Sequence, residues 1–413
     1  MGVGIFDLES SAKSSFKNWR WVFLFLAFAA TTINYLDRQT LSVLAPILHE
    51  QFRLSDLGYS RVVSAFLFAY TIANGLSGII IDRIGTKWGY GLCMLWWSTA
   101  SVLHAFARSA LSLGTCRFLL GFGEAGNWPA AIKMVAEWFP AQQRALASGI
   151  FNSGSSIGAA IAPPLVAAIA LHFGWRGAFA SIGALGFLWT FLWLALYFVP
   201  ERARAAVPVS RSGSGLLRSR FVWSLTLAKV FFDPAWYFYV FWFPQYLSSA
   251  RHFSLAQIGL YAWIPFVTAD CGNVAGGLFC RWLVGIGLGL IRSRRISLAV
   301  FVCFMTAAIP AVLVLDPRAS IAWVSLATFG YTGSLANMLA LPGDFFPPNV
   351  LGSIWGFASM GSGFGGILFT LLVGWIVERF AYVPVFIGFG LMPLLALSIL
   401  LLVTTRNEVK LCN

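Results

Sequence analysis

The chain has 413 residues, of which 59% are hydrophobic and only 10% are charged. A soluble domain has about 25% charged residues and could not bury so much apolar surface. The composition excludes an ordinary soluble domain and indicates a polytopic membrane protein.

Continuous apolar runs of about 20 residues recur along the chain, which predicts membrane-spanning helices rather than the alternating strands of a barrel. We predict twelve spans, at 21–41, 60–81, 89–107, 110–132, 146–171, 177–199, 220–247, 257–282, 296–315, 319–341, 351–377 and 384–404. A polar, Arg-rich stretch separates the sixth span from the seventh. The predicted fold is an all-α membrane protein with two pseudo-symmetric six-helix bundles, at 1–199 and 220–413, joined by a cytoplasmic linker at 200–219.

Basic residues are concentrated in alternate loops between these spans, which accounts for the net charge of +13 without any binding to nucleic acid. Cytoplasmic loops carry such an excess of Lys and Arg. We therefore expect a multi-pass protein in the lipid bilayer of the cell inner membrane, with both termini in the cytoplasm. The polar first 18 residues predict that no signal peptide is cleaved.

The two predicted halves repeat a sequence pattern. The segment Glu137-Trp138-Phe139-Pro140 is echoed 207 positions later by Asp344-Phe345-Phe346-Pro347, and the same offset relates Gly149 to Gly356 and Gly158 to Gly365. The alternative is chance similarity between glycine-rich membrane helices. Two six-helix halves in parallel orientation are typical of transporters whose binding site lies between the halves near the middle of the membrane.

No cofactor or metal site is expected from the sequence. Two G-x-G-x-x-G matches, at 121–126 and 361–366, lie within apolar helical runs, whereas a dinucleotide fingerprint follows a strand. Small-residue helix packing explains them better. The six cysteines include no C-x-x-C pair, so we expect them to be packing residues.

The predicted loop after the second span reads GIIIDRIGTK, residues 78–87. This segment resembles the loop signature of the major facilitator superfamily, G-x-x-x-D-R-x-G-[RK]-[RK]. The matching residues are Gly78, Asp82, Arg83, Gly85 and Lys87, and Thr86 departs from the pattern. The resemblance implies that these residues form a conformational latch, in which Gly78 lets two helices approach closely.

Four charged residues lie in predicted spans of the first half: Asp37 and Arg38 in 21–41, and Arg117 and Glu124 in 110–132. A charge in lipid costs about 2.5–3.5 kcal/mol on insertion scales, so such residues should face protein or water. Arg117 and Glu124 are seven positions apart, on one helix face and about 10 Å apart along the axis. We therefore expect each to have another partner.

Two hypotheses account for these charges. They could form a structural ion-pair network that fixes two helices together. Alternatively, their cancellation could be conditional, because a desolvated carboxyl group can hold a proton. Protonation of one acid would leave a net positive site that suits an organic anion, and a guanidinium binds a carboxylate in bidentate fashion. The second hypothesis predicts proton-coupled symport of an organic anion.

Longer motifs narrow the resemblance. The segments NYLDR, RFLLGFGEAGNWPA, EWFP, GIFNSGSSIGAAIAPPL, DPAWYFYVFWFPQYL and WIPFVTADCGN are similar to those of the anion:cation symporter family, and within it to bacterial hexuronate transporters. The resemblance implies that Arg38 binds the substrate carboxylate. It also implies that Asp37 and Glu124 are the titrating acids and that Arg117 modulates the protonation of Glu124.

The same resemblance assigns contacts with the sugar. Tyr35 and Tyr70 would contact it through their hydroxyl groups, and Ser155 and Ser156 would line the cavity. Some family members carry a Gln and an Asn where this chain has Ser155 and Gly363. The contacts with the sugar hydroxyls are therefore expected to differ.

The second half offers three further pairs: Lys229 and Asp233, Trp236 and Tyr237, and Asp270 and Asn273. The first pair has the spacing of an intrahelical ion pair. The aromatic pair could stack on a sugar ring or could face lipid or the core. Asp270 and Asn273 lie within a predicted span and could bind sugar hydroxyls.

The sequence thus predicts a monomeric symporter that imports a small anionic sugar acid, a hexuronate such as glucuronate or galacturonate, with protons by alternating access. Other organic anions remain open: an aldonate, an aromatic acid or a dicarboxylate. A dicarboxylate would need a second cation, which Arg117 or Lys229 could supply. A membrane enzyme lacks support, because no H-E-x-x-H motif or credible triad is present. A non-transporting sensor with this fold is a further alternative.

Overall fold

The computed structural model describes residues 4–199, 219–346 and 348–405, and all regular secondary structure in these ranges is helical. The predicted linker at 200–219 lies outside the described residues except for Ser219. The exact limits of the two domains therefore stay a prediction.

The first half of the chain contains α1 (Gly4–Val43), α2 (Ala45–Phe52), α3 (Asp56–Ile84), α4 (Thr86–His104), α5 (Ala110–Glu124), α6 (Asn127–Trp138) and α7 (Ala141–Leu196). Helices α5 and α6 follow one another across a break at Ala125 and Gly126, so the predicted span at 110–132 is a broken helix. Helix α7 is interrupted at Gly174, whose φ of 71° suits glycine. It therefore supplies both predicted spans 146–171 and 177–199.

The second half contains α9 (Arg220–Ser249), α10 (Leu255–Tyr261), α11 (Ile264–Gly285), α12 (Leu290–Met305), α13 (Ala308–Leu313), α14 (Pro317–Phe345), α15 (Pro348–Phe380) and α16 (Val383–Thr405). Short breaks separate α10 from α11 and α12 from α13. Each of these pairs occupies one predicted span, which matches the broken α5–α6 pair of the first half.

Side-chain caps explain where several helices begin. Ser55, Ser109 and Ser254 each accept a backbone N–H from the first turn of α3, α5 and α10, and Asp316 accepts two at the start of α14. Such caps satisfy donors that have no partner within the helix. The caps fix the entry of the chain into four of the predicted spans.

The helices of the described ranges coincide with the twelve predicted spans, but length and composition mark only some of them as able to cross a membrane. Four are long and apolar enough to cross a membrane (Ala147–Leu196, Leu290–Leu313, Ile354–Phe380 and Val383–Leu402), and the bent helix α3 is a fifth. The other passes contain polar residues, such as Asn34, Asp37 and Arg38 in α1, which make them less apolar. These polar passes carry the chemistry described below.

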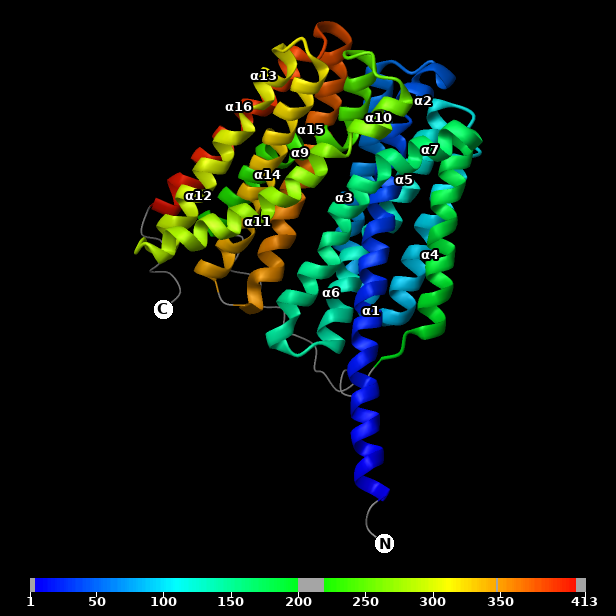
Figure 1. Cartoon of the computed structure of the whole chain (residues 1–413), viewed down its shortest axis with the longest axis vertical. Helices are drawn as coiled ribbons and strands as arrows, with labels where there is room; N and C mark the ends of the chain where they lie inside the picture. The colour runs from blue at the N-terminus through cyan, green and yellow to red at the C-terminus, as the bar shows by residue number, and fades with distance from the viewer. Residues whose placement is uncertain (1–3, 200–218, 347, 406–413) are drawn as a thin grey trace.

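The two halves form two adjacent bundles that meet at the end where α2 and α10 lie and diverge toward the end where the chain begins (Figure 1). At the joined end, the hydroxyl of Tyr59 on α3 donates to the carbonyl of Phe241 on α9 at 2.7 Å. The backbone N–H of Leu57 donates to Glu378 of α15 at 3.3 Å. Helices α3 and α15 pack tightly there, since a Cβ on Gly374 would lie 2.4 Å from the hydroxyl oxygen of Ser60.

The opposite end is more open. Gly78, Gly149, Gly277 and Gly356 lie on α3, α7, α11 and α15, and a Cβ added to any of them would meet no atom within 4 Å. The close helix approach predicted at Gly78 is therefore wrong for this conformation. The reason is that the two halves diverge at this end of α3, where Figure 1 shows the ribbons apart.

Candidate functional site

Arg38 on α1 and Glu124 at the end of α5 form a buried ion pair. Nε of Arg38 donates to Oε2 of Glu124 at 2.7 Å, and the two side chains are 7% and 0% exposed. The break between α5 and α6 follows Glu124 directly. Buried charges of this kind need excellent geometry to repay their desolvation. Nη2 of Arg38 has no hydrogen-bond partner in the described part of the chain, so the guanidinium retains a donor for a further acceptor.

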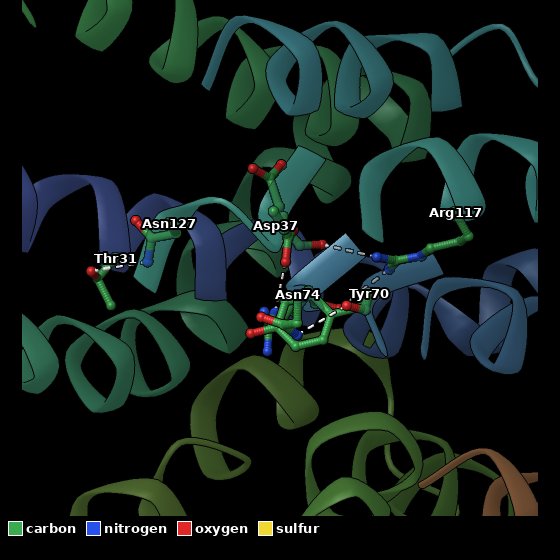
Figure 2. Close-up of polar contacts among 8 residues, drawn as sticks. Thr31, Asp37, Tyr70, Asn74, Arg117 and Asn127 are labelled. Carbon is green, nitrogen blue, oxygen red and sulfur yellow. Dashed lines mark hydrogen bonds and ion pairs between the residues drawn. The ribbon is translucent and has the colours of Figure 1, made fainter. Parts of the chain in front are cut away.

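Asp37 and Arg117 form the second part of the network (Figure 2). Oδ1 of Asp37 accepts a hydrogen bond from Ser101 of α4. Arg117 extends from α5 toward α1 and donates to the backbone carbonyls of Asp37 at 3.4 Å and Arg38 at 3.3 Å. Arg117 and Glu124 thus have separate partners, as their spacing predicted.

Aromatic rings surround the Arg38 guanidinium. Its central carbon lies 4.5 Å from the centroid of the Tyr70 ring, 5.1 Å from that of Tyr35 and 5.2 Å from that of Phe66. Phe66 also lies 5.8 Å from the Arg117 guanidinium. Cation–π contacts stabilise a desolvated cation by about 2 kcal/mol. The rings therefore hold the cation in place without neutralising it.

Close packing of α1 on α7 places Tyr35 beside Ser155. A Cβ on Gly158 would lie 2.5 Å from the carbonyl oxygen of Thr32 and 2.9 Å from Cβ of Tyr35. The side chains of Tyr35 and Ser155 interact, and the Ser155 hydroxyl also donates to the carbonyl of Asn152 at 2.7 Å. Both side chains are half-buried, so they border the charged network without closing it off.

The second half presents aromatic side chains on α9. Tyr237 shares a hydrogen bond of 3.1 Å with Ser362 of α15 and lies within electrostatic range of Tyr70 and Arg38. Trp236 stacks on Tyr331 of α14, with ring centroids 5.1 Å apart. Both α9 residues are half-buried. One face of Trp236 is thus occupied by protein, and Tyr237 connects α9 to the Arg38 region.

Lys229 and Asp233 form the predicted pair on α9. Nζ of Lys229 lies 2.7 Å from Oδ2 of Asp233, and their side chains are 9% and 7% exposed. The Tyr331 hydroxyl donates to the other carboxylate oxygen at 3.2 Å. Lys229 also lies 5.7 Å from the centroid of the Trp355 ring. The pair is buried, charge-neutral and held by neighbours from α14 and α15.

Asp270, Asn273 and Ser156 occupy a separate position. Asp270 of α11 is half-buried and interacts with Ser156 of α7, so this contact crosses between the two halves. Asn273 is exposed. No contact with the Arg38 network is described for these three residues. They lie on α7 and α11, which contact each other across the two halves.

The loop motif lies where α3 ends and α4 begins. Gly85 turns the chain with a φ of 85°. Asp82 forms an exposed ion pair of 3.0 Å with Lys133 of α6, while Arg83 is exposed. Lys87 accepts the indole N–H of Trp193 through its backbone carbonyl at 2.9 Å. All of these contacts are within the first half.

Glu137 and Asp344 occupy equivalent positions in the repeat but make different contacts. Glu137 of α6 accepts hydrogen bonds from Thr86, at 2.6 Å, and from Tyr197. Asp344, its counterpart in the repeat, instead pairs with Arg294, which lies 207 positions after Lys87. Thr86, which departs from the loop signature, thus donates a hydrogen bond to Glu137, whereas Asp344 at the equivalent position of the second half is ion-paired.

Three neighbours of the buried charges were not predicted from the sequence. Ser101 binds Asp37, Phe66 lies against both arginines, and Tyr331 binds Asp233. Phe66 precedes Tyr70 by one helical turn, a spacing that signals a shared face. Ser101 and Tyr331 come from distant helices and give no such local signal.

No metal centre is found among the described residues, where no group of three or more His, Cys, Asp or Glu side chains is placed to hold an ion. A cavity of about 440 Å³ lies between the end of α4 and the part of α7 that follows the break at Gly174, beside Phe106, Arg108 and Arg176. None of its lining residues belongs to the charged network.

Comparisons with known proteins agree with this architecture. The model of the Major Facilitator Superfamily matches residues 27–370. The chain is 32% identical over 394 residues to the hexuronate transporter of Escherichia coli strain K12, with 90% of each chain covered. It is 33% identical over 303 residues to the galacturonate transporter of Dickeya chrysanthemi, covering 68% of this chain and 87% of that one. It is 27% identical over 411 residues to the D-galactonate transporter of Escherichia coli O6:H1, covering 93% and 95%.

Solved structures show the same fold. A bacterial homologue of the human lysosomal transporter Spinster, in an inward-facing and occupied conformation, superposes with a TM-score of 0.73 at 18% identity and covers 94% of this chain and 96% of its own. A variant of the nucleoside transporter NupG gives a TM-score of 0.72 at 13% identity, covering 92% and 99%. The chain belongs to the major facilitator superfamily and is a membrane transporter, not an enzyme.

Proposed function

We infer that the protein imports a small anionic sugar acid, most plainly a hexuronate such as glucuronate or galacturonate, together with protons. The observation that carries this inference is the buried pair of Arg38 and Glu124 beside Asp37 and Arg117. Its net charge depends on the protonation of two acids. The sugar acids named for the similar transporters support the substrate class.

Arg38 is the proposed partner of the substrate carboxylate. Its remaining N–H donors and planar fork suit bidentate binding, and the rings of Tyr35 and Tyr70 hold it in position. In this scheme Ser155, Ser156, Trp236, Tyr237, Asp270 and Asn273 contact the sugar hydroxyls or ring. Tyr237 is best placed of these for a role beside Arg38, because it lies near Tyr70.

Competition for Arg38 is the proposed basis of proton coupling. Glu124 occupies the guanidinium in its charged form. A proton on Glu124 would weaken this bond and release Arg38 for the substrate. Asp37, held by Ser101, is the second proposed acid, and Arg117 keeps the backbone of both α1 residues in place. Substrate and proton would then bind together. The proton removes the Glu124 charge that competes for Arg38, and the substrate occupies the guanidinium that stabilises this charge.

Alternating access would move the two halves about this site. The described conformation is joined at the α2 and α10 end and open at the other end. The distribution of Lys and Arg supports a cytoplasmic position for the basic loops, and the opening would then face the cytoplasmic side of a bacterial inner membrane. Gly78, Asp82, Arg83, Gly85 and Lys87 would act as the latch when the open end closes.

The decisive experiment is uptake of radiolabelled glucuronate into proteoliposomes, with and without an inward proton gradient. Accumulation that the gradient stimulates is the expected result. Equal uptake without the gradient would overturn proton coupling, and the absence of uptake and binding would overturn the hexuronate assignment.

An aldonate is the second candidate substrate. Its support is the similarity to the D-galactonate transporter over nearly the whole chain. An aldonate has the same single carboxylate, so Arg38 could bind it in the same way. Competition of galactonate, galacturonate and an aromatic acid against labelled glucuronate ranks these classes directly, and a dicarboxylate belongs in the same panel.

A further inference from the structure

We propose that Asp233 sets the charge class of the substrate, an inference that rests on the proposed function. Asp233 neutralises Lys229, and Lys229 is a second carboxylate-binding group that this pairing masks. The wild-type site would then accept sugar acids with one carboxylate and disfavour aldarates, which have two.

The supply of cations supports this assignment. Among the described residues, the buried lysines and arginines are Arg38, Arg117 and Lys229. Arg117 is committed to two backbone carbonyls of α1. Lys229 is therefore the buried cation of the second half that could meet a second carboxylate, and Asp233 already holds it at 2.7 Å.

The position of the pair relative to Arg38 supports a role in recognition. Asp233 lies one helical turn before Tyr237 on α9, and its charge acts on Tyr237 together with that of Arg38. The Lys229–Asp233 pair thus lies on the second-half helix that approaches the proposed carboxylate partner. A linear sugar diacid has its two carboxylates at opposite ends, so it requires cations on both sides of the site.

Asp233 is also held in place so that its ion pair with Lys229 persists. The Tyr331 hydroxyl donates to Oδ1 of Asp233 at 3.2 Å, and Tyr331 is fixed between the stacked rings of Phe232 and Trp236. A carboxylate that is bonded on both oxygens cannot swing away to admit a competing anion without losing both contacts. Residues of both α9 and α14 therefore keep Asp233 paired with Lys229.

The test compares two ligands that share a six-carbon skeleton: glucuronate, with one carboxylate, and glucarate, with two. Binding of each to the purified full-length protein is measured by calorimetry for wild type and Asp233→Asn. The Asn side chain keeps an oxygen for Tyr331 but frees Lys229. The expected result is a shift of the glucarate-to-glucuronate affinity ratio toward glucarate by roughly tenfold or more, since one desolvated charge pair is gained.

Matched variants identify the group responsible. Asp233→Glu should keep the wild-type ratio because it keeps the charge, and Asp233→Asn combined with Lys229→Gln should lose the gain for glucarate. If Asp233→Asn does not purify as a folded protein, Asp233→Ser exposes Lys229 with a smaller side chain that can still accept from Tyr331.

The outcomes separate the two levels of inference. An unchanged ratio in Asp233→Asn, with glucuronate bound by the wild type, overturns the masking role and leaves the proposed function standing. A gain that persists in the double variant also overturns it, because Lys229 would not be the group involved. Failure of the wild type to bind either acid overturns the proposed function and the masking role together.

Discussion

Nε of Arg38 donates to Glu124 across 86 positions of sequence, at 2.7 Å and away from solvent. A substrate carboxylate that binds Arg38 therefore meets a carboxylate that is already there. Two negative groups cannot share one guanidinium in a dry site without a strong Coulomb cost. This relationship links substrate binding to the protonation of Glu124 and leads to the first two predictions.

Replacing Arg38 with Lys should reduce the specific uptake of glucuronate by roughly 100-fold, although the charge is kept. Lysine is a point charge, so it cannot form the planar two-donor contact with the substrate carboxylate once Glu124 has released the cation. Uptake into proteoliposomes measures the change. Arg318→Lys, at an exposed site, is the matched control and should behave like the wild type. Normal uptake by Arg38→Lys would remove Arg38 from the site.

Glu124→Gln should abolish gradient-driven accumulation while it retains exchange of labelled for unlabelled glucuronate. The amide cannot carry the proton, but its oxygen can still accept from Arg38, so the binding geometry survives. Exchange and accumulation are measured in the same proteoliposomes, and Glu50→Gln at an exposed position is the control. Equal loss of both activities would argue against a coupling role for Glu124.

Gly158→Ala should lower the free energy of unfolding by about 1–3 kcal/mol, because the added Cβ would overlap the backbone of Thr32 and push against Tyr35. Gly149→Ala lies on the same helix and faces open space, so its unfolding temperature should not fall. Thermal unfolding in detergent compares the two variants. If both are equally stable, α1 and α7 do not pack as closely as described.

Rising pH should weaken the joined end of the two halves through Asp56. Burial raises the pKa of Asp56 above its usual value, and the carboxylate of Glu378 raises it further. The contact is therefore most stable below the ordinary pKa of Asp56 and loses stability as the pH rises through the raised pKa, when the two carboxylates repel.

Spin labels on cysteines introduced at Gln51 and Phe380, both exposed, would report this opening by pulsed electron paramagnetic resonance. The long-distance population should grow as the pH rises above about 4, the ordinary pKa of an aspartate carboxyl group. Asp56→Asn should stay closed over the same rise in pH. An identical pH response in Asp56→Asn would assign the opening to another group.

Replacing Asp82 with Asn should change the stability of the described conformation by less than about 1 kcal/mol, because the pair with Lys133 is exposed. If the loop acts as a latch, the same change should instead slow transport, since the latch forms when the open end closes. Unfolding temperature and uptake rate, measured on one preparation, separate these effects. A large loss of stability with a normal rate would contradict the latch.

Local patterns in the sequence were enough to predict several contacts of the site. The four-residue spacing of Lys229 and Asp233 predicted their ion pair, because side chains one turn apart on a helix are neighbours. The seven-residue spacing of Arg117 and Glu124 predicted that they would not pair with each other. Contacts between distant helices gave no such signal. The Ser101 bond to Asp37 depends on where packing against α5 and α7 places α4 relative to α1.

Apolar length and charge are properties of each segment alone, so the class of protein, the expected spans and the costly charges within them could be predicted without a structure. Which charge meets which could not, because it depends on the fold. Arg38 forms an ion pair with Glu124, Arg117 donates to backbone carbonyls, and Asp233 accepts a hydrogen bond from Tyr331. These pairings depend on helix rotation and packing. The tertiary structure also decided that Gly78 faces open space, because the divergence of the two halves is a property of the conformation and not of the motif.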